Sequence, residues 1–263
     1  MDVVEGLWAQ VTTPLPQLPT AILVGALVAA GAVVLAPALW RPARTVVTIA
    51  HEGAHGLVAL AAGRRLSGIR LHSDTSGLTV SAGRPTGPGM VLTCAAGYTG
   101  PALFGLGAAA LLAAGHAVGL LWALLGLLAL LLVQIRNWYG LWAVLVTGAL
   151  LVGVTVWGSA TVQSVAAYAM TWFLLLGAPR AVLEMQSERR RGRRRGVPDT
   201  SDAGMLGRLT HTPGALWVGI LLLGAPRAVL EMQSERRRGR RRGVPDASDA
   251  GLLGRLTHTP GAL

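Results

Sequence analysis

Long apolar stretches constrain this chain more than any other feature of its sequence. Of the 263 residues, 52% are hydrophobic and only 13% are charged, whereas a soluble domain typically carries about a quarter charged residues. A stretch of about 20 apolar residues can cross the hydrocarbon core of a bilayer as one helix. We therefore predict an all-α integral membrane protein, a multi-pass bundle of about six transmembrane helices. The spans are expected at residues 20–40, 45–63, 89–113, 116–135, 138–157 and 160–178.

The segment between the second and third predicted spans has a different pattern. Apolar residues alternate with polar ones at Ile69 and Leu71, and again at Leu78 and Val80, on either side of the turn-forming residues 74–77. Alternation around such a turn is typical of a β-hairpin. We expect a small β-hairpin after the second span, outside the hydrocarbon.

The charge of the chain is strongly positive and comes only from arginine. The sequence has 23 arginines against 12 acidic residues, and a formal net charge of +11. The arginines lie in short segments between apolar spans, a placement that fixes topology and attracts anionic lipid. We therefore expect a cell-membrane protein with a cytoplasmic N-terminus, which contacts anionic lipid and does not bind nucleic acid. The oligomeric state is left open.

The C-terminal part of the chain contains a tandem copy. Residues 174–216 recur as 221–263 with two differences, at Thr200/Ala247 and Met205/Leu252. Copies this similar indicate a recent duplication or a sequence-assembly artefact, because old structural repeats drift in sequence. We expect four regions: an interfacial head (1–19), a membrane domain that holds the spans (20–187), a basic cytoplasmic loop with a short apolar segment (188–220), and the copy, which is expected to be redundant (221–263).

One short motif carries chemistry. His51 and His55 are four residues apart, so on a helix they lie on one face and can provide two ligands to a tetrahedral zinc ion. Glu52 lies beside them, where it can take a proton from water and later pass it to a leaving amine. Ionisable groups within a membrane span are costly and indicate function. The motif predicts a zinc site with His51 and His55 as ligands and Glu52 as the general base.

In this arrangement the chain resembles the site-2 protease family of intramembrane zinc metallopeptidases, in its bacterial and uncharacterised branch. The resemblance rests on the His51–His55 motif in the second span, the small hairpin after it, and the Gly-Pro-containing span with residues 96–101. It implies a multi-pass membrane fold, a catalytic zinc ion and cleavage of a peptide bond in or near the membrane. The substrate is then a membrane protein or peptide.

The family typically takes a third zinc ligand from a later span, an aspartate in an Asn-x-x-Pro…Asp-Gly context, and this chain lacks that motif. Glu184, at the end of the sixth span, is the leading candidate, although an i,i+4 ion pair with Arg180 would also explain it. Asp202 is the alternative candidate, although it could instead cap a following helix. Asn137 is the third candidate and would be a weak ligand.

Two further function classes remain open on the sequence. The missing family motif favours a catalytically inactive, protease-like membrane scaffold that binds membrane-protein clients, whereas the intact Glu52 favours the enzyme. A transporter of small solutes is the other class, and an inverted internal repeat would support it. The repeat found here is tandem.

Overall fold

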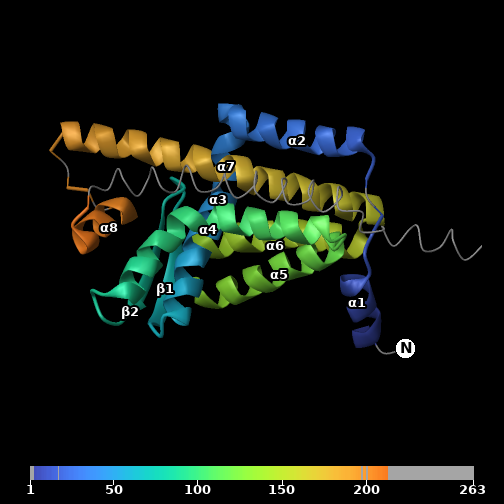
Figure 1. The fold of residues 1–263 in the computed structure, drawn as a ribbon, viewed down its shortest axis with the longest axis horizontal. Coiled ribbons are helices and arrows are strands. Elements are labelled where there is room, and N and C mark those ends of the chain that lie inside the picture. Colours follow the sequence, from blue (N-terminus) through green and yellow to red (C-terminus); the bar gives the residue numbers. More distant parts are fainter. Residues whose placement is uncertain (1–2, 17, 197, 200, 213–263) are drawn as a thin grey trace, which may run out of the picture. The chain divides into compact units, whose positions relative to one another are not determined.

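The computed structural model describes residues 3–16, 18–196, 198–199 and 201–212, and these form a helical protein with one small sheet (Figure 1). The second copy, residues 221–263, lies outside the described residues. The predicted fold class is confirmed. In chain order the elements are α1 (Val3–Thr12), α2 (Thr20–Leu35), α3 (Pro37–Ala61), β1 (Arg65–Leu71), β2 (Gly77–Ala82), α4 (Pro88–Ala113), α5 (Ala117–Gln134), α6 (Trp138–Trp157), α7 (Ala160–Arg194) and α8 (Asp202–Thr210).

The first two predicted spans form a sharply bent pair of helices. The sequence predicted a break at residues 41–44, between the spans 20–40 and 45–63, and this is wrong because these residues lie inside α3. The chain breaks instead at Ala36, whose backbone is extended, and α2 and α3 meet at an angle of 99°. A residue that precedes proline is disfavoured in the α conformation, and Pro37 follows Ala36 directly. The break is therefore set by a proline.

Within the described residues, four helices are long and apolar enough to cross a membrane, and five spans result if the bent pair counts as one. The sequence predicted about six. The four helices, α4 to α7, correspond to the last four predicted spans. The difference arises because α2 has only 16 residues, short of the roughly 20 that a bilayer requires.

The predicted hairpin is present, and one of its strands belongs to the core. β1 and β2 pair antiparallel, with Ile69 opposite Thr79. The side chains of Ile69 and Leu71 are buried against residues of α3, α5 and α6, including Leu131. Those of Leu78 and Val80 on β2 are exposed. The first strand of the hairpin is thus packed between helices. The second strand contacts α3 on one side and exposes Leu78 and Val80 on the other.

Helix α7 is longer than the sequence predicted. It continues through Pro179 and the basic residues to Arg194, so the expected loop at the start of the basic run is wrong. The extension consists mainly of good helix formers and carries an i,i+4 pair between Arg180 and Glu184, which stabilises this part of the helix.

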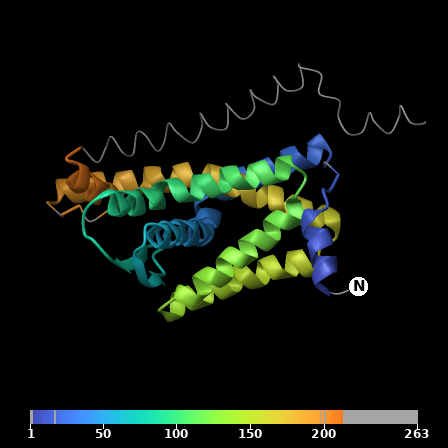
Figure 2. The same ribbon diagram turned by 60° about the horizontal axis from the view of Figure 1, so that its bottom comes forward.

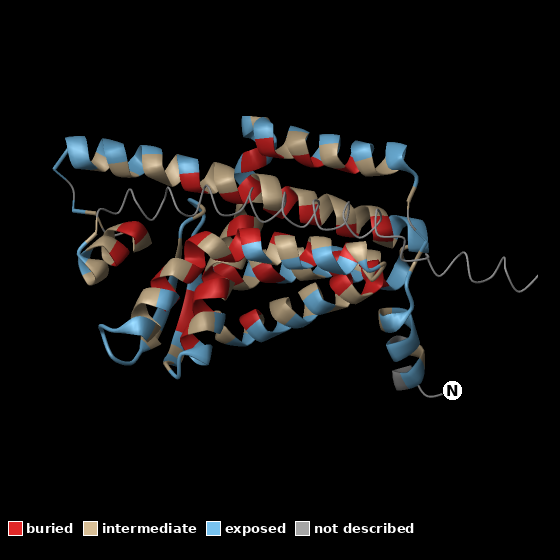
Figure 3. Ribbon diagram, viewed as in Figure 1, coloured by how far each residue is buried: buried red, intermediate tan, exposed pale blue. Residues whose placement is uncertain are grey.

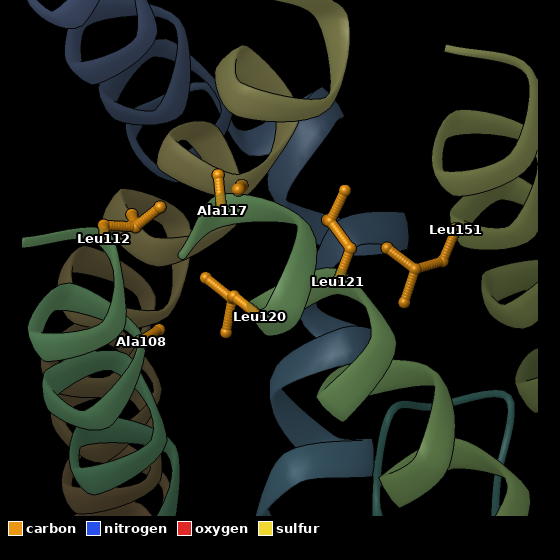
Figure 4. Close-up of a cluster of buried hydrophobic side chains, with 7 residues drawn as sticks. Ala108, Leu112, Ala117, Leu120, Leu121 and Leu151 are labelled. Carbon is orange, nitrogen blue, oxygen red and sulfur yellow. The ribbon is translucent and has the colours of Figure 1, made fainter. Parts of the chain in front are cut away.

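The buried core lies between α3, α4, α5, α6 and α7. α3 packs along α4, where small residues such as Ala54 and Gly100 allow close approach. A second cluster of buried side chains joins α4, α5, α6 and α7 around Leu121 (Figure 4). Buried residues concentrate on the facing sides of these helices, whereas α1 is mostly exposed (Figure 3). In a second view, α5 and α6 run obliquely to α4 and α7 (Figure 2).

Candidate metal centre

The two histidines of the motif lie on the face of α3 that is turned toward α4. Their rings meet edge to face, with centroids 4.7 Å apart, and their Nε2 atoms are 3.2 Å apart. The four-residue spacing produces this proximity because an α-helix has 3.6 residues per turn. Two imidazole nitrogens therefore converge on one point.

Asp202, the first residue of α8, completes the group. Its Oδ2 atom lies 3.2 Å from Nε2 of His51 and 3.0 Å from Nε2 of His55. Ligands about 2.0–2.1 Å from a tetrahedral zinc ion lie about 3.4 Å from one another. The three atoms thus form a triangle of nearly the size that one metal ion requires, from the residue types that zinc prefers. Within the described part of the chain, this is the one such group of three His, Cys, Asp or Glu side chains.

Contacts around His55 and Asp202 bear on their capacity to bind a metal ion. Nδ1 of His55 lies 2.7 Å from the carbonyl oxygen of Thr93, so an N–H at Nδ1 can donate to it and leave Nε2 free as a ligand. Burial tends to raise the pKa of Asp202, but its contacts with His51 and His55 outweigh burial and hold that pKa below its usual range. The Asp202 side chain is therefore a carboxylate, the form that binds metal.

Glu52 is held in place by the hairpin. The carboxyl group is buried, and its Oε2 atom accepts a hydrogen bond of 2.6 Å from the hydroxyl of Thr79 on β2. The same hydroxyl also lies 3.1 Å from the Glu52 carbonyl oxygen. The strand approaches this closely because residue 77 is glycine: a Cβ there would lie 2.5 Å from Oε1 of Glu52. The hairpin thus fixes the rotamer of the candidate base.

Gly97 of α4 provides the space for the histidine rings. A Cβ atom at this position would overlap Nε2 of His55 and would lie 2.6 Å from Nε2 of His51. The ligand nitrogens can therefore converge only if residue 97 has no side chain.

A Gly97→Ala variant is expected to bind zinc at least about tenfold more weakly than the wild type, because its methyl group displaces both ligand nitrogens. The measurement is zinc affinity by competition with a chelator. Gly107→Ala is the matched control on the same helix, since a Cβ at that position has open space around it: within 4 Å it would meet only its chain neighbours and nearby backbone of α4 among the described residues. Equal zinc affinity in the two variants would show that Gly97 does not border a metal site.

The leading candidate for the third ligand lies elsewhere. Glu184 accepts a hydrogen bond of 2.9 Å from Nε1 of Trp40 and pairs with Nε of Arg180 at 3.1 Å and Nε of Arg44 at 3.6 Å. The structure therefore does not bring Glu184 to the histidines. The reason is geometric: Glu184 contacts Trp40 near the start of α3, whereas His51 lies about three turns further along that helix.

Asn137 is also engaged away from the histidines. Its side-chain amide donates to the carbonyl oxygen of Leu71 at 2.6 Å, and its Oδ1 atom accepts from the Leu71 backbone amide at 3.1 Å. The side chain thus imitates a neighbouring strand and holds β1 to the junction of α5 and α6. This contact gives Asn137 a structural role.

A His-His-Asp group beside a buried glutamate, in a chain with helices that can cross a membrane, is the arrangement expected of an intramembrane metallopeptidase. A family model described as Peptidase M50B-like matches residues 24–225, which include the motif, Thr79, Gly97 and Asp202. The match covers most of the chain, and the protein belongs to this family, so the resemblance found in the sequence is confirmed. A search of curated proteins and a search of solved structures each found no match.

The sequence did not single out four residues that shape the site: Thr79, Thr93, Gly97 and Tyr98. The ring of Tyr98 stacks edge to face on His51, with centroids 5.8 Å apart, and its hydroxyl accepts from the Ala203 backbone amide at 3.2 Å. The available signal was the cluster of Gly and Pro at residues 96–101, which indicates close contact between membrane helices. It does not say which helix makes that contact.

Proposed function

We propose that the protein is a zinc-dependent endopeptidase that cleaves a peptide bond within or next to the membrane. The observation that supports this most directly is the convergence of His51, His55 and Asp202, with ligand atoms 3.0–3.2 Å apart. The two histidines lie on the helix that also carries Glu52. A purely structural zinc site would not require a carboxylate at position 52.

Each residue of the site has a separate role in the proposed reaction. His51, His55 and Asp202 would hold the metal, which when bound supplies Lewis-acid chemistry by acidifying water and polarising the scissile carbonyl. Glu52 accepts a proton from the attacking water and returns it to the nitrogen of the leaving amine. Thr79 holds Oε2 of Glu52 throughout. This hydrogen bond keeps the base in one orientation.

The membrane setting of the site suggests the substrate class. Helices long and apolar enough to cross a membrane include α4, which packs along the helix of the two histidines. A polypeptide that reaches this site is expected to lie within or next to the membrane. We therefore propose a membrane protein or membrane peptide as the substrate.

Arginines at the charged end of α7 support the proposed contact with anionic lipid. A polar cavity of about 700 Å³ lies between the start of α3, the hairpin turn and α7, and its lining includes Arg41 and Arg191 beside the ion pairs of Glu184. Arginines next to the end of an apolar span attract lipid phosphates. We propose the cell membrane as the location, with a cytoplasmic N-terminus. With α4 to α7 as the four spans, that orientation places the arginines before α4 and the basic run at the end of α7 on the cytoplasmic side.

The test begins with zinc. In lipid nanodiscs, the wild-type protein is expected to contain about one zinc ion per chain, and His55→Ala little or none. The wild type is then incubated with tagged polypeptides that each contain one apolar span of 20 residues, and mass spectrometry identifies the products. Cleavage that disappears with a zinc chelator supports the proposal. No zinc in the wild type, prepared without chelators and supplied with zinc, would overturn it.

A second candidate is an inactive membrane scaffold that binds membrane-protein clients. The observation that favours it is the absence of the Asn-x-x-Pro…Asp-Gly context that surrounds the third ligand in studied relatives. The same experiment separates the two functions, because a scaffold would retain clients in a pull-down and leave every polypeptide of the set uncleaved with zinc bound.

A further inference from the structure

The proposed third ligand is carried by a segment that follows the last long helix. Asp202 begins α8, a helix of nine residues beyond the end of α7 (Figure 1). Isolated helices of this length are marginal in water. A ligand on such a helix must therefore be held in place by contacts outside the helix itself.

One ion pair closes the connection between the two helices. Arg189, near the end of α7, donates from Nε and Nη2 to Oδ2 of Asp199 at 2.8 and 2.6 Å. Its third nitrogen, Nη1, donates to Oε1 of Gln186 at 2.9 Å. The Arg189 side chain is only 9% exposed, although the run it belongs to is otherwise mostly exposed. The Arg189 side chain thus has a structural role, whereas its exposed neighbours in the run are solvated.

Asp199 also forms hydrogen bonds with Ser201 at the start of α8. Its Oδ1 atom accepts from the hydroxyl of Ser201 at 2.5 Å and from the Ser201 backbone amide at 3.1 Å. Ser201 in turn caps α8, and its hydroxyl oxygen accepts from the Gly204 backbone amide at 3.3 Å. Arg208 adds a hydrogen bond of 2.8 Å to the Asp199 carbonyl oxygen. An unbroken chain of contacts therefore leads from Arg189 to the residue that precedes Asp202.

We propose that Arg189 and Asp199 are positioning residues for metal binding, and that their ion pair ties Asp199, and through Ser201 the start of α8, to α7 so that Asp202 reaches His51 and His55. This inference rests on the metal site of the proposed function. Neither residue touches the metal. Their effect is to reduce the number of positions that Asp202 explores, which lowers the entropic cost of bringing the third ligand to the histidines.

The expected result is a loss of zinc affinity when the pair is broken. Arg189→Ala is expected to bind zinc about 10- to 100-fold more weakly than the wild type, the range typical for residues that orient metal ligands. Arg189→Lys is expected to be intermediate, because lysine keeps the charge but cannot make the forked contact. Arg190→Ala is the matched control from the same basic run: its side chain is exposed, and its affinity should stay within about twofold.

A double-substitution cycle tests whether Arg189 acts through Asp202. In a background of Asp202→Ala, the third ligand is gone, so adding Arg189→Ala should lower the residual zinc affinity no further. A further loss of similar size in that background would show that Arg189 only supports the general fold and would overturn the proposal, as would wild-type affinity in Arg189→Ala.

The readout also separates this inference from the proposed function. Because zinc affinity is measured by competition with a chelator, a protein that binds zinc but cleaves nothing still tests the role of Arg189 fully. Conversely, a wild-type protein that binds no zinc would refute the metal site and this inference together.

Discussion

Replacing Asp202 by alanine is expected to abolish tight zinc binding and all zinc-dependent cleavage, whereas replacing Glu184 is expected to leave both in place. Asp202 contributes one of three ligand atoms that lie 3.0–3.2 Å apart. Loss of one ligand leaves two imidazoles, which hold a metal ion far more weakly than a three-ligand site. We expect a drop in zinc affinity of more than about 100-fold, measured by chelator competition.

Glu184→Ala is the informative comparison because the sequence alone favoured that residue as the ligand. Its carboxylate accepts from Trp40 and pairs with Arg180 and Arg44. Truncation leaves the Trp40 indole N–H without this acceptor, so we expect a loss of about 1–2 kcal/mol of stability, seen as a lower thermal unfolding midpoint. Loss of zinc in Glu184→Ala together with normal zinc in Asp202→Ala would reverse the assignment.

A Glu52→Gln variant is expected to keep its zinc and lose about 10²- to 10⁴-fold in the rate of cleavage, the usual contribution of a general base. Glutamine has nearly the same shape as glutamate, and its amide oxygen can still accept from Thr79, so the site should stay intact. It cannot accept a proton from water at neutral pH. The measurements are zinc content and the rate of product formation under single-turnover conditions.

The control for this variant is Glu188→Gln. Glu188 is an exposed glutamate of α7, and its replacement removes one negative charge without touching the site. Cleavage at the wild-type rate is expected. If Glu52→Gln instead lost zinc to the same degree as His55→Ala, Glu52 would be a ligand or a folding residue, and the assigned division of roles would be wrong.

The two variants together distinguish the enzyme from the scaffold. Both functions allow a zinc ion at His51, His55 and Asp202, so zinc content alone does not discriminate between them. Only in an enzyme does the rate of product formation depend on whether residue 52 can accept a proton. The single-turnover rate with Glu52→Gln is therefore the decisive quantity once zinc binding is established.

Much of this protein follows from local sequence. Apolar runs near 20 residues predict spans because the thickness of the bilayer fixes helix length, and α4, α5 and α6 begin and end within two residues of expectation. The four-residue spacing of His51 and His55 predicts their proximity because the pitch of the helix fixes it. The alternation around residues 74–77 predicts the hairpin for the same kind of reason.

The tertiary structure decided what sequence spacing cannot encode. Glu184 and Asp202 were both plausible ligands, and only the path of the chain after α7 brings the second to the histidines. The same holds for Thr79 on Glu52 and for Gly97 beneath the two rings, since each contact joins residues 27 or more positions apart. A local pattern fixes which side chains share one helix face. Which distant segment packs against that face depends on the packing of the whole bundle, and here that packing selects the third ligand.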